Sequence, residues 1–394
     1  MKILSRWMLA LSLVLSSVFI SSNADPVPPP SVIADNSISL LPKSDVVAVL
    51  DVARLVNDLL PKAKQAWPEQ VAKMEKEINE VISEAAKNGI DLYKVKSLAI
   101  GLNLFGSKTT GAMIVDGLTV TPEMMAKEDK ERTVIDYKGK TLYIEKPKPE
   151  PKPLVKSAAR NASKRKTLAA SKRSAPTSKT RTAKAPPSSS KNNPLSNVTD
   201  VASNMGANLL KENTAFVQLD ESRVAIGDEA QVKTVIDALT EGANPAHNLG
   251  AELSAALQET SATGLLRFAV NIPDSARQAA EGEAILKNLA VTRMVLGSLD
   301  VTDDMSLSLD AKLRTGSADE ATKLHESLAA LLGLGKMMLG GNQDPMMTML
   351  NKMLDQIRIS PQSNDVSLAI MVPRELYETF LKSDPKATPA KSNK

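Results

Sequence analysis

Stretches in which apolar and polar residues alternate recur along the chain, at residues 97–104, 305–313 and 366–372. Because successive side chains of a β-strand point to opposite faces, this pattern predicts strands with one apolar face. Strands of this kind are typical of antiparallel sheets that helices cover on a single face. Residues 46–50, VVAVL, are apolar throughout, which favours a strand in the middle of a sheet.

A longer period marks the helices. From Trp67 to Ala85, apolar residues recur every three or four positions opposite a charged face, which predicts an amphipathic helix. Further helices are expected from Asp228 and from Ser317, where a possible N-cap is followed three residues later by Gln or Glu. Strands and helices follow one another in a similar order in two parts of the chain. The sequence therefore predicts an α+β protein of two related units, each mainly antiparallel sheet covered on one face by helices.

Composition sets the predicted boundaries of these units. The first unit is expected at 38–240 and the second at 241–381. A Pro-rich leader at 25–37, a segment rich in Lys, Arg, Pro, Ser and Ala at 146–195 and a tail at 382–394 contain few large apolar residues. Such segments bury too little surface to offset the entropy of ordering and are predicted to be disordered.

The repeated order of strands and helices indicates where the basic segment lies relative to the two units. The second unit ends in two strands and a helix, and the first finds this ending only in residues 216–239, beyond the basic segment. We therefore interpret residues 146–195 as a disordered insertion within the first unit. A plain linker between two domains is the alternative.

The first 24 residues have the three parts of a secretory signal peptide. Lys2 and Arg6 provide a positive start, residues 7–20 an apolar core, and Ser22-Asn23-Ala24 a cleavage site with small residues where a signal peptidase reads them. We expect export to the periplasm or the extracellular medium, with Asp25 as the mature N-terminus. The core is too short to span a bilayer, and no transmembrane segment is expected in the mature chain.

Charge is distributed very unevenly. Between Lys146 and Lys191, fourteen basic residues face one acidic residue, a net of +13, although the whole chain carries only +4. With +2 in the signal peptide, the rest of the chain carries −11. A flexible basic segment on an acidic protein predicts contact with anionic envelope polymers or lipid headgroups, and nucleic acid is not expected as the main partner. A soluble spacer is the alternative. The candidate contact residues are Lys164, Arg165, Lys166, Lys172 and Arg173.

Three blocks carry a resemblance: LLPKSDVVAVLDVARLV, YKGKTLYIE and RVAIGDEAQVKTVIDAL. They resemble segments of a group of uncharacterised exported bacterial proteins with repeated α+β units, in which a strand, a Gly-Asp turn and a helix follow one another. The resemblance implies a secreted α+β protein and no particular activity. From the residues themselves, Asp228 and Gln231 are interpreted as a capping box for the following helix.

Residue types that usually carry chemistry are scarce. The chain has no cysteine and two histidines, His247 and His325, and neither His has a second metal ligand at diagnostic spacing. Residues 101–110 superficially resemble a phosphate-binding loop but lack its lysine and are interpreted as a hairpin turn. The aspartates at 300, 303 and 304 are interpreted as a solvated turn in preference to a calcium site. No catalytic residue, metal site or cofactor is predicted.

Methionine is the remaining unusual feature. Six methionines lie between residues 337 and 353, in a chain in which only 3% of residues are aromatic. We interpret them as core residues that replace missing aromatics, with Cu(I) or an apolar ligand as the other uses of such a cluster. The sequence favours a non-catalytic exported protein that binds or scaffolds. The alternatives are a hydrolase or transferase that uses carboxylates only, and a carrier of apolar ligands.

Overall fold

A computed structural model describes residues 37–69, 71–72, 79, 83, 86, 91–106, 108–119, 132–145, 214–242, 248–281, 287–340, 345–376 and 378. The predicted signal peptide, the leader up to residue 36, the basic insertion and the tail lie outside these residues. The five basic residues predicted to contact polyanions therefore also lie outside them. Ser37, assigned to the leader, is buried and begins a helical turn, so the folded part begins at least one residue before the predicted boundary.

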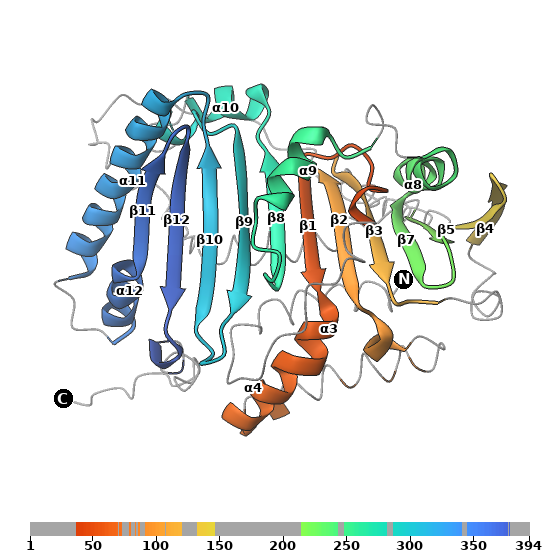
Figure 1. The fold of residues 1–394 in the computed structure, drawn as a ribbon, viewed down its shortest axis with the longest axis horizontal. Coiled ribbons are helices and arrows are strands. Elements are labelled where there is room, and N and C mark those ends of the chain that lie inside the picture. The colour runs from red at the N-terminus through yellow and green to blue at the C-terminus, as the bar shows by residue number, and fades with distance from the viewer. Residues whose placement is uncertain are drawn as a thin grey trace, which may run out of the picture.

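One sheet of twelve antiparallel strands runs the length of the molecule (Figure 1). Its order is β11-β12-β10-β9-β8-β1-β2-β3-β7-β6-β5-β4. The α+β class predicted from the sequence is confirmed. The strands are β1 (Val46–Asp51), β2 (Ser97–Asn103), β3 (Thr110–Asp116), β4 (Arg132–Tyr137), β5 (Lys140–Glu145), β6 (Thr214–Gln218), β7 (Arg223–Asp228), β8 (Leu266–Asn271), β9 (Met294–Val301), β10 (Leu307–Arg314), β11 (Ile357–Gln362) and β12 (Asp365–Val372).

The described helices connect these strands. After β1 the chain continues through α3 (Val52–Arg54), the π-helical turn η1 (Leu55–Leu59) and α4 (Leu60–Ala66), and η2 (Leu92–Lys94) precedes β2. The others are α8 (Glu229–Glu241), α9 (Ala251–Gln258), α10 (Asp274–Glu281), η4 (Lys287–Leu289), α11 (Ala318–Leu339) and α12 (Pro345–Asp355). Of these helices, α3, α8, α9 and α11 contact the sheet. Trp67 and Val71 of the helix predicted from residue 67 are buried.

The two halves of the sheet are joined by the antiparallel pair β1 and β8, with Val47 opposite Ala269. β1 lies between β2 and β8, as its apolar sequence predicted. From this pair the order β1-β2-β3-β7 runs one way and β8-β9-β10-β12 runs the other. Strands from both sides of the basic segment are neighbours, because β5 pairs with β6 through Leu142 and Val217.

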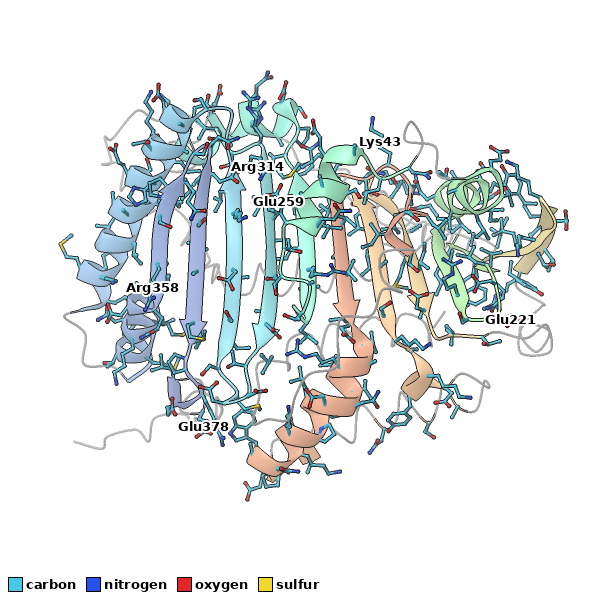
Figure 2. All side chains as sticks on the ribbon, in the orientation of Figure 1. Lys43, Glu221, Glu259, Arg314, Arg358 and Glu378 are labelled. Carbon is cyan, nitrogen blue, oxygen red and sulfur yellow. The ribbon has the colours of Figure 1, made fainter. Side chains whose placement is uncertain are left out.

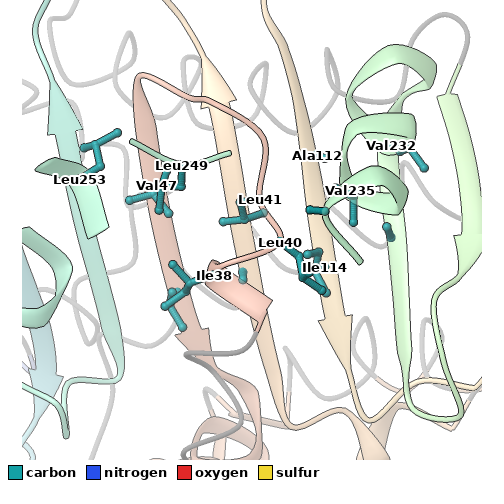
Figure 3. Packing of buried hydrophobic residues seen from close by; sticks show 14 of the residues in the cluster. Ile38, Leu40, Leu41, Val47, Ala112, Ile114, Val232, Val235, Leu249 and Leu253 are labelled. Carbon is teal, nitrogen blue, oxygen red and sulfur yellow. The ribbon is translucent and has the colours of Figure 1, made fainter. Parts of the chain in front are cut away.

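One face of the first half is covered by α8 and by the N-terminal residues 37–45, here called the strap, and α9 extends this cover over β8 and β9 (Figure 3). The strap is held in place by Leu249, whose N–H donates to the carbonyl of Leu41, and by the Asn248 side chain, which donates to the carbonyl of Ser39. It passes so close to β2 that a methyl group at Gly101 would lie 2.6 Å from Ser44 Oγ. Small residues in the strands therefore make room for the strap.

The opposite face of the sheet is also covered. Its core includes residues from α3, η1 and the end of α4, and α11 packs on the same face over β10, β11 and β12. The prediction that helices cover only one face is therefore wrong for the first half of the sheet. The prediction failed because small residues alternate with large apolar ones in these strands, and small residues are typical of positions exposed to solvent. Ala99, Ala112, Ala215 and Ala225 are all buried beneath the strap and α8.

Arg54 joins the two halves electrostatically. Its guanidinium lies 2.7 Å from the Asp300 carboxylate at the end of β9, and its Nη2 donates to the carbonyl of Val301 at 3.1 Å. The Arg54 side chain is 12% exposed and that of Asp300 27%. Burial raises the pKa of Asp300 above its usual value, while the charge of Arg54 acts in the opposite direction. Without Arg54, a mostly buried carboxylate would lose its counter-ion.

We expect Arg54→Ala to lower the free energy of unfolding by about 2 to 4 kcal/mol, because it leaves Asp300 unpaired in a largely buried position. The matched control is Lys62→Ala, which removes an (i, i+4) partner of the more exposed Asp58 and should cost less than about 1 kcal/mol. Urea unfolding followed by circular dichroism measures both variants. Equal losses would show that the Arg54–Asp300 pair does not hold the two halves together.

Candidate interaction surface

The clearest unpartnered surface of the described chain lies on the C-terminal half of α11. Leu331 and Leu334 are 44% and 47% exposed, and Met337 and Met338 are 73% and 74% exposed. All four lie within the helix and within two turns of one another. α11 stands at the outer end of the sheet beside the edge strand β11 (Figure 1). The four side chains, here called the apolar stripe, therefore face outward from one end of the molecule.

The side of α11 that holds Leu334 and Met337 is charged about three turns earlier in the helix. At about 100° per residue, Lys323 lies within about 20° of Leu334 around the helix, and Glu326 lies within about 20° of Met337. Both of these charged residues are exposed, as expected for the outer side of a surface helix. Ala321 and Leu324 on the inner side are fully buried, whereas Leu331, which follows Leu324 by about two turns, is 44% exposed. The outer side of α11 thus changes from charged to apolar along one helix.

The stripe itself contains no charged residue. Lys336 is the only ionisable residue between positions 327 and 339, and its Nζ forms an ion pair of 2.9 Å with Asp355 of α12. α12 packs beside α11, and its Met353 lies partly buried against the main core. The prediction that the methionine cluster fills a core is therefore wrong for Met337 and Met338. Sequence periodicity missed them because both sides of this half-helix are apolar.

A second surface is polar and is fixed by ion pairs. Arg314 of β10 donates from Nη1 and Nη2 to Glu259, at 3.1 and 2.7 Å, and from Nε and Nη2 to Asp365, at 3.0 Å each. Figure 2 shows Glu259 and Arg314 side by side over the upper part of the sheet. Hydrogen bonds from Arg314 lower the pKa of Glu259, and those to Asp365 and Glu259 raise the pKa of Arg314. These groups hold the end of α9 onto β10 and β12, so their charges are already paired.

The sequence analysis considered a phosphate-binding loop, a calcium site and two histidines as chemical candidates. Residues 101–110 belong to the β2–β3 hairpin, as predicted. Asp300 is paired with Arg54 rather than solvated, whereas Asp304 accepts hydrogen bonds from Thr302 and Ser306 in the following turn. His325 is half-buried on α11, and His247 lies outside the described residues. Within the described ranges, no group of three or more His, Asp or Glu side chains could hold a metal ion.

The Gly-Asp turn after β7 has a role other than the predicted capping box. Asp228 is the N-cap residue of α8, but its side chain makes no capping bond and instead accepts a hydrogen bond of 2.7 Å from the N–H of Gly111 in β3. At Gly227 a methyl group would lie 2.3 Å from the carbonyl oxygen of Gly111. The motif therefore fastens β7 to β3, and its glycine is required by this close approach.

Asp116 is a buried carboxylate that the sequence analysis did not single out. It is 1% exposed, and its Oδ2 accepts hydrogen bonds from Ser37 at 2.7 Å and from Ser97 at 3.0 Å. Its Oδ1 has no hydrogen-bond partner in the described part of the chain. Burial raises the pKa of Asp116 above its ordinary value, although both serine hydrogen bonds oppose this effect. The carboxylate ties the beginning of the strap to β3.

Comparison with known proteins adds little. No protein-family model and no curated protein matches the chain. Among solved structures, crystal form III of TP0453 matches with a TM-score of 0.39 and 9% identity, over 90% of this chain and 98% of that one. Crystal form I of TP0453 matches with a TM-score of 0.37 and 8% identity, over 90% and 97%. Scores this low do not establish a shared fold. Separately, none of the described helices is both long and apolar enough to cross a membrane.

For Asp116 we expect a stability effect that depends on pH. A raised carboxyl pKa means that the folded state binds the proton more tightly than the unfolded chain does. The contribution of Asp116 to stability therefore falls as pH rises from its ordinary pKa of 3.8 through the raised value, and is constant above it. In Asp116→Asn, which can still accept the two serine hydrogen bonds, this fall should be absent.

The measurement is urea unfolding of both proteins from about pH 4 to about pH 7. The difference in unfolding free energy between wild type and Asp116→Asn isolates this carboxyl from the other titrating groups. A difference that stays constant with pH would contradict the assignment. Asp116→Ala serves as the comparison that also removes the hydrogen-bond acceptor, and it should be less stable than Asp116→Asn throughout.

Proposed function

We propose that this is a non-catalytic exported protein that binds the surface of a lipid bilayer through the apolar stripe of α11. The observation that carries the proposal is the exposure of Leu331, Leu334, Met337 and Met338 on the outer side of a helix at the end of the molecule. Amphipathic helices lie in the membrane interface with their apolar side chains among the acyl chains and their charged side chains outside. The stripe supplies such an apolar side without spanning the membrane.

A lipid surface fits this stripe better than a small apolar ligand. The four residues are exposed within two turns of one helix, which also contacts α12 and β11. A ligand pocket surrounds most of its ligand with protein, whereas a bilayer needs contact from one side only. Leucine and methionine are flexible apolar side chains, and flexible side chains adapt to a fluid acyl environment. The carrier function considered in the sequence analysis therefore has less support than membrane-surface binding.

The basic segment supplies a second attraction in this proposal. A single weak apolar anchor gives marginal membrane binding, and stable attachment needs a second signal such as a basic patch. Residues 146–191 carry +13, and juxtamembrane basic segments gain about 1 kcal/mol per Lys or Arg near an anionic surface. Because the rest of the mature chain carries −11, the basic segment would offset repulsion between the folded body and anionic lipids. The predicted signal peptide provides the route to a membrane outside the cytoplasm.

To test the stripe, we expect Leu334→Glu combined with Met338→Glu to weaken binding of the mature protein to liposomes by about tenfold or more, because two carboxylates would enter the acyl region. The matched control is Thr322→Glu with Ala329→Glu, which adds the same charge to exposed positions on another side of α11. Flotation with vesicles of neutral phosphatidylcholine measures both. If the two double variants bind alike, or if wild type does not bind, the stripe is not a membrane surface.

A second experiment separates the two attractions. We expect deletion of residues 146–191 to weaken binding to vesicles that contain anionic lipid and to leave binding to neutral vesicles unchanged. The salt dependence of binding to anionic vesicles should fall with the deletion, since exposed charges are screened within about 8 to 10 Å at physiological ionic strength. If the full chain and the deletion variant bind anionic vesicles equally, the segment does not contribute to binding and acts as a spacer.

A further inference from the structure

The sheet ends at β4, and one edge of this strand faces away from β5. β4 and β5 are joined by Lys138 and Gly139, with φ of +51° and +74°, the two left-handed residues of a type I′ turn. Such a turn makes Tyr137 and Lys140 a hydrogen-bonded pair, and these pairs alternate along the ladder. The backbone groups of Arg132, Val134 and Asp136 therefore point away from β5. Within the described chain, no strand pairs with this outer edge.

The other end of the sheet is protected against pairing, and β4 is not. In β11 a two-residue turn makes Gln362 and Asp365 a hydrogen-bonded pair, so the next outward position is Pro361. Proline has no N–H, and edge strands commonly use it to prevent association with another sheet. β4 has no proline and presents Val134 with half of its surface exposed. An exposed apolar residue at the centre of an edge strand favours pairing with a further strand.

The sequence of β4 is complementary to itself in one antiparallel register. When Val134 lies opposite Val134 of a second copy, Arg132 lies opposite Asp136 and Asp136 opposite Arg132. All three outward-pointing residues then meet outward-pointing residues, so each outward N–H faces a carbonyl. Opposite charges directly across strands are favourable, and the two valines form an apolar pair at the centre. Shifting the register shortens the overlap and separates the opposite charges.

The hairpin that carries this edge is held firmly by α8. Tyr137 donates a hydrogen bond of 3.0 Å to Asp237, and Lys138 forms an ion pair of 2.6 Å with the same carboxylate. The ammonium of Lys233 lies 5.4 Å from the centre of the Tyr137 ring. Burial and the hydrogen bond to Asp237 raise the pKa of Tyr137, which keeps its hydroxyl protonated as the donor. The edge is therefore fixed in place before any partner arrives.

We propose that two copies of this chain associate edge to edge through β4, forming a two-fold symmetric dimer with a continuous sheet of twice the length. The partner is a second copy because a single register satisfies the backbone, the charges and Val134 together. A two-fold axis at Val134 also matches the way most homodimers form, with the same patch contributed by both subunits. This proposal is independent of the apolar stripe, which lies at the opposite end of the sheet.

Cysteine cross-linking tests the register, because the natural chain contains no cysteine. In the proposed dimer the two Val134 Cα atoms are about 5.5 Å apart, within the range that a disulfide bridges. The variant Val134→Cys should form a disulfide-linked dimer under mild oxidation, seen on non-reducing gels. The matched control is Thr133→Cys, at the exposed neighbouring position. In that variant the two cysteines would be displaced by two positions along the strands, about 7 Å besides the spacing between strands, and should not cross-link.

Sedimentation tests association without a cross-link. Wild type should form a concentration-dependent dimer, and Val134→Pro should be monomeric, since it removes an outward N–H and leaves the ladder with β5 intact. Val134→Lys and Val134→Glu should each be monomeric alone and dimeric when mixed, because like charges would face each other in the homodimers. Circular dichroism checks that each variant is folded. A monomeric wild type at its highest soluble concentration, or equal cross-linking of the Thr133→Cys and Val134→Cys variants, would overturn the proposal.

Discussion

The pairing of β1 with β8 is the contact on which the architecture depends. It joins two sets of strands into one sheet, and it places the apolar strand VVAVL where both of its faces can be buried. Arg54, immediately after β1, adds an ion pair to Asp300 of the second half. The end of α4 is tied to the far end of the chain as well, since the Trp67 indole N–H donates to Glu378 at 3.1 Å. Residues of both halves therefore share one core.

Small residues determine how that sheet is covered. On one face of the first half, alanines and glycines of neighbouring strands leave space for α8 and the strap to approach the backbone. The buried carboxylate of Asp116 anchors the strap at this face, because it accepts a hydrogen bond from the hydroxyl of Ser37. A buried charge with one unpaired oxygen is costly, so this contact links the position of the strap to the protonation of a single group.

The two proposed surfaces lie at opposite ends of the sheet and differ in chemistry. At one end, α11 covers the last strands, and Pro361 removes one outward N–H from the sheet edge. That end presents apolar side chains on a helix. At the other end, β4 presents backbone groups and a valine. A dimer through β4 would place two copies of the stripe at the far ends of one extended sheet.

The sequence alone determined the class of the fold, because alternation and helical periodicity are local properties. Strands such as 305–313 and 366–372 were found near their observed positions for this reason. Covering of the second face was not predicted, since an alanine beneath the strap and an alanine facing water look the same in a sequence. The role of Asp228 was also missed, because its hydrogen-bond partner Gly111 lies 117 residues away.

The interaction surfaces were decided only by the tertiary structure. Met337 and Met338 were expected in a core because apolar side chains usually lie inside, and only the position of α11 at the end of the sheet shows their outward direction. The open edge of β4 likewise follows from the order of strands, which is set by contacts between distant segments. The distribution of charge could be read from the sequence, since composition does not depend on folding. Exposure depends on which elements pack together, and that is a property of the whole fold.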